Sequence, residues 1–243
     1  MSSFVLTMAS PAWRKRGFVQ LFVLTVLVLL LIPLQLRFRV LGFILILLYL
    51  NAVAVCLTAA GYRRLRAPFL AGWVLVLALK LVPVPDPHVA TWFYVASRIL
   101  VLTLLGGCVI AVLAYVLRSA VVSADKIFAA IVAYMLAALG FAAAYQAIVA
   151  VAPESFAVPH VPGAGDPAEL LEFRLIYFSF VTIATLGYGD ITPRLPLAQM
   201  LSVLEAMVGQ FYVAVVIAWL VSMYVAHRVR RAPSPDEVTS RRA

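Results

Sequence analysis

The chain has 243 residues, of which 65% are hydrophobic and 12% are charged. Water-soluble domains carry about 25% charged residues, so this composition excludes a soluble globular protein and favours lipid as the surrounding medium. The net charge of +9 could suggest a nucleic acid partner, but the basic residues cluster between apolar runs, and we expect none. Cys56 and Cys108 lie inside apolar runs, so we expect neither a disulfide framework nor a metal cofactor.

Six apolar segments approach or reach the length of about 20 residues that a spanning helix needs. In chain order they cover approximately residues 17–32, 40–60, 69–82, 91–117, 127–151 and 197–226. The first could be a signal peptide, because Arg14, Lys15 and Arg16 precede it. No small-residue cleavage site follows, so we interpret it as an uncleaved first helix.

The loop charges predict an orientation. If each segment crosses once, most basic residues lie in loops on one side and most acidic residues on the other. Basic loops face the cytoplasm, so we expect a multi-pass protein of the cell membrane with both termini cytoplasmic. The basic loops would also suit anionic membrane lipids. Arg37 and Arg39 depart from this rule, and the alternative is that the first two segments lie differently.

The pattern divides the chain into three parts. Residues 1–118 would form a four-helix membrane domain and residues 119–231 a pore domain, and the polar tail 232–243 would be disordered and cytoplasmic. In the pore part, Asp166, Pro167 and Glu169 are typical of a helix start. The apolar stretch 170–184 that follows is too short to span the membrane and is typical of a re-entrant helix.

A glycine-alternating stretch follows the short helix and reads Thr185-Leu186-Gly187-Tyr188-Gly189-Asp190. Non-helical backbone inside a membrane is tolerated only where protein or water surrounds it, so the pattern predicts a re-entrant pore loop. A dehydrated potassium ion needs oxygen atoms in place of its water. Backbone carbonyls can supply them if the strand alternates between right- and left-handed residues, and Gly187 and Gly189 tolerate the left-handed conformation.

This stretch resembles the signature sequence of potassium channels, which here is Thr182-x-x-Thr185-x-Gly187-Tyr188-Gly189-Asp190, followed by Ile191-Thr192-Pro193. The resemblance covers roughly residues 125–231. It implies an all-α membrane protein with six transmembrane helices, a re-entrant pore helix and a selectivity filter at the axis of a homotetramer. It also implies that K+ binds to carbonyl oxygens of Thr185, Leu186, Gly187 and Tyr188, with Gly189 completing the filter. The Tyr188 ring would point away from the pore.

Four residues are candidates for filter support, namely Thr182, Asp190, Tyr177 and Glu205. Tyr177 could hold Asp190 behind the filter. Relatives that carry a carboxyl at position 181 differ from this chain, which has Val181. Glu205 lies inside an apolar helix, and we expect it to hydrogen-bond the pore helix near Thr182; the alternative is a carboxyl held without a role.

The last apolar segment contains a candidate gating hinge at Gly209, for which close helix packing is an equal alternative. By resemblance, the cavity below the filter is lined by Gln210, Val213, Ile217 and Val221. Four acids precede the filter and could attract cations, although an ordinary solvated outer loop is the simpler interpretation; they are Glu154, Asp166, Glu169 and Glu172.

Two other classes of protein compete with a potassium channel. A cation transporter subunit usually carries several degenerate pore loops, whereas this chain has one intact loop. A membrane enzyme would need a nucleophile–base set, a metal site or a phosphate loop, and the sequence contains none of these patterns.

The fourth segment predicts weak or no voltage dependence. A voltage sensor needs several basic residues at every third position, whereas this segment has Arg98 inside it, expected to snorkel toward the outer interface, and Arg118 at its end. We therefore expect the conductance in symmetric K+ to change by less than about threefold between roughly −100 and +100 mV. Single-channel and macroscopic currents in pure lipid measure this, and a steep conductance–voltage curve would contradict it.

Overall fold

The computed structural model describes residues 17–35, 53–54, 57, 61–62, 64, 66–82, 84–118, 123–159 and 167–230. Most of the predicted second segment, residue Asp166 of the predicted helix start and the tail 232–243 lie outside these residues. The described helices are α2 (Gly17–Gln35), α4 (Arg66–Leu81), α5 (Pro87–Leu117), α6 (Ala124–Val151), α7 (Pro167–Ile183), α8 (Pro196–Phe211) and α9 (Ala218–Arg230). A π-helical segment, Tyr212–Ile217, joins α8 to α9.

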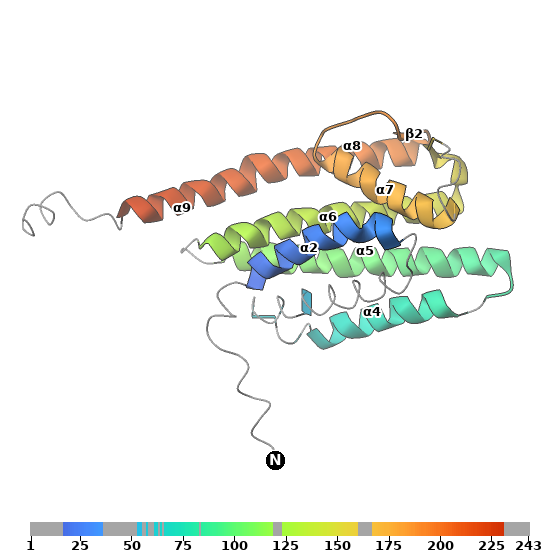
Figure 1. Ribbon diagram of the computed structural model, residues 1–243, viewed down its shortest axis with the longest axis horizontal. Coiled ribbons are helices and arrows are strands. Elements are labelled where there is room, and N and C mark those ends of the chain that lie inside the picture. Colours follow the sequence, from blue (N-terminus) through green and yellow to red (C-terminus); the bar gives the residue numbers. More distant parts are fainter. Residues whose placement is uncertain are drawn as a thin grey trace, which may run out of the picture.

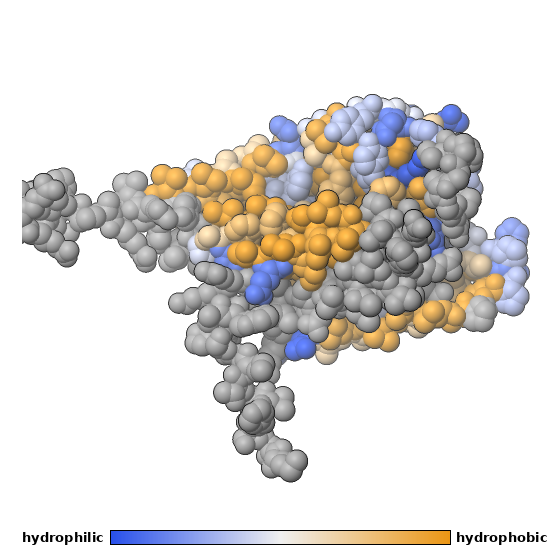
Figure 2. All heavy atoms as spheres, in the orientation of Figure 1, coloured by the Kyte–Doolittle hydropathy of each residue, from blue (hydrophilic) through white to orange (hydrophobic). Residues whose placement is uncertain are grey.

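In the described part of the chain, three helical stretches are long and apolar enough to cross a membrane: Pro87–Leu117, Ala124–Val151 and Pro196–Met223. They correspond to the predicted fourth, fifth and sixth segments, and this part of the predicted membrane fold is confirmed. The apolar parts of α2 and α4, Gly17–Ile32 and Arg66–Leu79, are shorter. Figure 2 shows hydrophobic residues along the helices and hydrophilic residues mainly toward their ends.

Helix α6 lies at the centre of the bundle. It packs against α5, α2 and α7, and α4 packs on the far side of α5 (Figure 1). Many of its buried residues are alanines, whose small side chains let neighbouring helices approach closely. In the most apolar 18-residue stretch of α6, 56% of the residues are buried, whereas in the corresponding stretch of Pro196–Met223 only 17% are buried. The α8 side of the structure therefore leaves a large apolar face open.

Carboxylates cap the N-terminal ends of two of the leading helices, α5 and α2. Asp86 caps α5 by accepting a hydrogen bond from the His88 amide at 2.8 Å, and Pro87 occupies the first helical position. Asp125, in the first turn of α6, accepts hydrogen bonds from the Phe18 and Val19 amides at 3.1 and 3.4 Å. Asp125 therefore caps the start of α2 from a different helix.

A short antiparallel pair of strands joins the chain before α7 to the chain after it. Strand β1 (Phe156–Ala157), which follows α6 and the 3-10 turn η2 (Pro153–Ser155), pairs with β2 (Thr192–Pro193). The Arg194 amide also donates to the Ser155 carbonyl at 2.8 Å. The chain after position 190 is thereby tied to the end of α6 before it enters α8.

Candidate functional site

Helix α7 ends in a Schellman motif directly before the glycine-alternating stretch. Thr185 adopts the left-handed conformation with φ of 56°. Its amide donates to the Thr182 carbonyl at 2.9 Å, and the Leu186 amide donates to the Val181 carbonyl at 2.9 Å. These two bonds, from the first and second residues past the helix cap, are the defining pair of this motif.

The other two carbonyls of the last turn also have donors. The Ala184 amide donates to the Phe180 carbonyl at 3.2 Å. The Tyr134 hydroxyl, from α6, donates to the Ile183 carbonyl at 2.7 Å. The four successive carbonyls from Phe180 to Ile183 thus all have donors, which fixes the point where the backbone leaves α7.

The backbone then alternates in hand. Positive φ angles occur at Thr185, Gly187 and Gly189, with values of 56°, 58° and 77°. A β-branched residue with positive φ is unusual, and the Schellman bonds hold Thr185 in this conformation. Residues 184–190 are all exposed in the single chain, and Leu186 is 57% and Tyr188 65% exposed.

Tyrosine rings support this stretch from the α7 side. The rings of Tyr177 and Tyr188 are stacked, with centroids 6.4 Å apart and planes inclined by 17°. The Tyr177 side chain also forms a hydrogen bond with the side chain of Asp190. The structure therefore brings together Tyr177, Tyr188 and Asp190. Thr182 takes part through its backbone carbonyl, which accepts the hydrogen bond from the Thr185 amide.

Glu205 on α8 is fully buried beside α7. The Tyr145 hydroxyl donates to its Oε2 at 2.6 Å, and the Ser179 hydroxyl is in very short contact with its Oε1. Its partner on α7 is thus Ser179, three residues before the expected Thr182. The reason is that Ser179 lies on the buried face of α7, where its hydroxyl also reaches the Ala138 carbonyl at 2.6 Å.

The hydrogen bonds of Ser179 indicate how the Glu205 carboxyl is protonated. A serine hydroxyl has one proton, so it can donate to the Ala138 carbonyl or to Glu205, but not to both. If Glu205 is a carboxylic acid, it donates to Ser179, which then donates to Ala138, and every group is satisfied. A neutral acid also suits a fully buried group with hydroxyl partners and no salt bridge among the described residues.

Gly209 lies against the end of α7. A Cβ atom added to it would stand 2.0 Å from the Ile183 carbonyl oxygen and 2.9 Å from the carbonyl carbon. The structure therefore requires glycine here for close packing. The local change in helix geometry comes three residues later, in the π-helical segment Tyr212–Ile217. Tyr212 fixes the start of that segment by donating to the Ala130 carbonyl at 2.7 Å.

The π-helical segment alters which residues of the last helix face outward. Gln210, Val213 and Val221 are exposed, as cavity-lining residues would be in a single chain. Ile217 instead packs against the main hydrophobic cluster. A π turn contains one residue more than an α-helical turn. Residues that follow it therefore lie on a different face of the helix from the one that a regular 3.6-residue period predicts.

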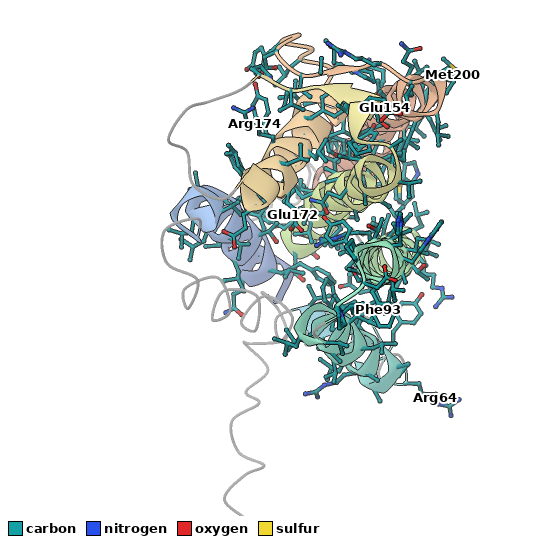
Figure 3. The ribbon with its side chains drawn as sticks, turned by 90° about the vertical axis from the view of Figure 1, so that its right-hand side faces the viewer. Arg64, Phe93, Glu154, Glu172, Arg174 and Met200 are labelled. Carbon is teal, nitrogen blue, oxygen red and sulfur yellow. The ribbon has the colours of Figure 1, made fainter. Side chains whose placement is uncertain are left out.

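The structure corrects the expectations for Arg98 and Glu172. Arg98 does not snorkel but is 7% exposed, and its Nη2 lies 2.8 Å from Oε1 of Glu172. Glu172 belongs to α7 rather than to a solvated loop, and Figure 3 shows it between α7 and the neighbouring helices, with Arg174 at the periphery. The sequence could not reveal the pair, because the two residues are 74 positions apart.

Sequence reasoning missed several polar partners from α6. Tyr134, Tyr145 and Gln146 each hydrogen-bond a group of α7 or of α8. The available signal was their polarity within an alanine-rich apolar segment, where polar side chains need partners. Among the described residues, no group of three or more His, Cys, Asp or Glu side chains is placed to bind a metal ion.

Comparisons with known proteins agree with this site. A family model described as "Ion channel" matches residues 165–226. The two pore potassium channel c of Oryza sativa subsp. japonica is 40% identical over 47 residues, which are 19% of this chain and 10% of that protein. The alignment thus spans about a tenth of the length of this curated relative. No solved structure matches the chain.

Replacement of Gly209 tests whether it is required for packing. Gly209→Ala places a methyl group into the Ile183 carbonyl, so we expect a destabilisation of about 1–3 kcal/mol and a lower midpoint of thermal unfolding in detergent. Gly107→Ala on α5, where a Cβ meets nothing within 4 Å, is the control and should leave the midpoint unchanged. A Gly209→Ala protein of wild-type stability with altered opening would instead support the hinge.

Replacement of Glu205 tests its role and its protonation. Glu205→Val leaves the Tyr145 and Ser179 hydroxyls without their shared partner, and we expect a loss of about 1–3 kcal/mol of stability. Glu205→Gln should stay near wild type, because an amide can donate to Ser179 and accept from Tyr145 as a neutral acid does. Thermal unfolding and single-channel recording measure both variants. Destabilisation by Gln as large as that by Val would show that the carboxyl is ionised.

Proposed function

We propose, from the match of residues 165–226 to a family model described as "Ion channel", that this chain is a potassium-selective channel subunit that conducts K+ passively across the cell membrane. The observation that carries the proposal is the backbone after α7. A capped helix end is followed by left-handed residues at every second position, 185, 187 and 189. In such a strand successive carbonyls turn toward one side, where they can replace the hydration water of an ion.

The proposed ion-binding groups are the carbonyl oxygens of Thr185, Leu186, Gly187 and Tyr188, with the Thr185 hydroxyl as an additional ligand. Gly189 continues the alternation at the outer end. The stack of Tyr177 on Tyr188 and the Tyr177–Asp190 hydrogen bond support this assignment, because they hold the strand from the side of the pore helix. Carbonyl dipoles held at a set spacing favour an ion that fits their number and field strength.

One strand cannot enclose an ion, so we propose a homotetramer around a central axis. Two features of the single chain support this. The whole strand 184–190 is exposed, and α8 carries a face of large exposed apolar side chains. That face comprises Leu197, Met200, Val203, Leu204, Met207 and Phe211. Contiguous apolar surface of this kind is covered in a membrane either by lipid or by neighbouring subunits.

The proposed roles of the remaining residues follow from their positions. Thr182, Glu205 and Tyr177 support the filter from α7 and α8, and Gly209 allows the inner helix to approach the filter base. Below the filter, Gln210, Val213 and Val221 would line the ion pathway. The orientation with both termini cytoplasmic, and contacts of the basic loops with anionic lipids, are part of the same proposal.

Weak voltage dependence also fits the position of Arg98. Moving a charge through the membrane field requires that the charge be free to change position. Arg98 is buried and paired with Glu172 on the pore helix, so it belongs to a fixed contact rather than to a moving series.

The test is ion flux through purified protein in vesicles with a potassium gradient. We expect passive K+ flux that exceeds Na+ flux by at least about tenfold. Coupled flux would indicate a transporter, and equal permeation of Na+ and K+ would refute a carbonyl filter.

A matched pair of glycine variants tests the backbone argument. Neither Gly187 nor Gly106 has an atom within 4 Å of an added Cβ, but Gly187 has φ of 58°, whereas Gly106 has no positive φ. Because an alanine is strained at the positive φ of Gly187 but not in the helical conformation of Gly106, Gly187→Ala should abolish selective K+ flux and Gly106→Ala should preserve it. Selective flux through Gly187→Ala would contradict the proposed filter.

A further inference from the structure

We propose that Arg98 is a positioning residue, through which α5 sets the position of the pore helix α7 and thereby the conformation of the filter. This inference rests on the proposed function. It assigns to the leading helices a role that does not depend on a moving voltage sensor. Its basis is a cluster of polar side chains from three helices near the start of α7, in which Arg98 and Gln146 are buried and Tyr94 and Glu172 are partly buried.

The cluster is centred on the Glu172 carboxyl. Its Oε1 accepts hydrogen bonds from Arg98 Nη2 at 2.8 Å and from the Tyr94 hydroxyl at 2.9 Å. Both donors come from α5, one turn apart, and the Arg98 guanidinium lies over the Tyr94 ring at 4.5 Å from its centroid. The Glu172 side chain of α7 is therefore held by two residues of the same neighbouring helix, α5.

Gln146 connects the cluster to the pore-helix backbone. It accepts a hydrogen bond from Arg98 Nη1 at 3.0 Å and donates from Nε2 to the Glu172 carbonyl at 3.1 Å. Arg98 therefore acts on α7 through both the side chain and the main chain of Glu172. Nε of Arg98 is buried without a partner among the described residues, so these two contacts carry its hydrogen bonding.

The position of this cluster on α7 makes it suitable for control of the filter. Glu172 and Ser179 are seven residues apart, so they lie two turns apart on one face of α7. Ser179 contacts Glu205 of α8, and Tyr145 of α6 donates a hydrogen bond to the same carboxyl. The next residue of α6, Gln146, donates to the Glu172 carbonyl instead. Helix α7 is thus held at one level by the inner helix and at the other by α5.

The energetics favour a fixed register between α5 and α7. A guanidinium that is 7% exposed is costly to leave unpaired, so Arg98 cannot leave Glu172 without another partner. A shift of α5 must therefore either carry the start of α7 with it or break the pair. Since α7 ends at the base of the filter, a change in its tilt changes the geometry of the carbonyls that follow.

The experiment compares Arg98→Met, Glu172→Gln and the double variant, each as the full chain in vesicles of one defined lipid. The readouts are the K+/Na+ permeability ratio from reversal potentials and the rate at which the K+ current declines during sustained conduction. We expect each single variant to change at least one readout by roughly fivefold. The double variant should show no larger change than either single variant, because all three break the same interaction.

The control variant is Arg64→Met, which alters an exposed residue beside α4, on the side of the bundle away from Glu172 (Figure 3), and should behave as wild type. If Arg98→Met does not assemble, Arg98→Lys replaces it, since an ammonium keeps the charge but cannot reproduce the two-pronged contact with Gln146 and Glu172. Wild-type selectivity and time course in the Arg98 and Glu172 variants would overturn the inference, as would changes that multiply in the double variant. Wild-type protein that fails to pass K+ selectively would instead refute the proposed function.

Discussion

The structure depends above all on how the C-terminal end of α7 is held. The backbone of residues 185–190 forms no regular secondary structure, so its position must come from its attachment. Here the Schellman bonds of Thr185 and Leu186 turn the chain out of the helix, and Tyr134 donates to the Ile183 carbonyl. Gly209 lets α8 lie directly against that carbonyl. A displacement of any of these contacts moves the start of the strand.

Helix α6 organises the polar contacts around that end. Tyr134, the Ala138 carbonyl, Tyr145 and Gln146 lie along it and meet α7 or α8 at successive levels. Inside a membrane a polar group without a partner is costly, so each of these bonds also specifies which helix must lie beside α6. The small side chains of α6 allow the approach, and its polar side chains determine the register.

The leading helices contact α7 through a fixed ion pair, whereas a voltage sensor would carry a series of mobile basic residues. One arginine, Arg98, is buried and fixed to α7 by Glu172. At the other end of the bundle, Asp125 of α6 caps α2. The leading helices are therefore attached to α6 and α7 near both ends of the bundle, which favours a supporting role for them over large independent movement.

The sequence by itself determined the apolar character, the three long spans, the short helix starting at Pro167 and the glycine-alternating stretch, because hydrophobic length and glycine conformation are local properties. Glu205 was recognisable as a buried acid for the same reason, since a carboxyl in an apolar helix must find a partner. Only the tertiary structure decided which partners: Ser179 rather than Thr182 for Glu205, Glu172 for Arg98, and the Ile183 carbonyl for Gly209. The packing of Ile217 against the core likewise depends on the π-helical segment, which the sequence did not predict. These pairings depend on the rotation and offset of helices far apart in the chain, which hydrophobic periodicity leaves open because every face of these helices is apolar.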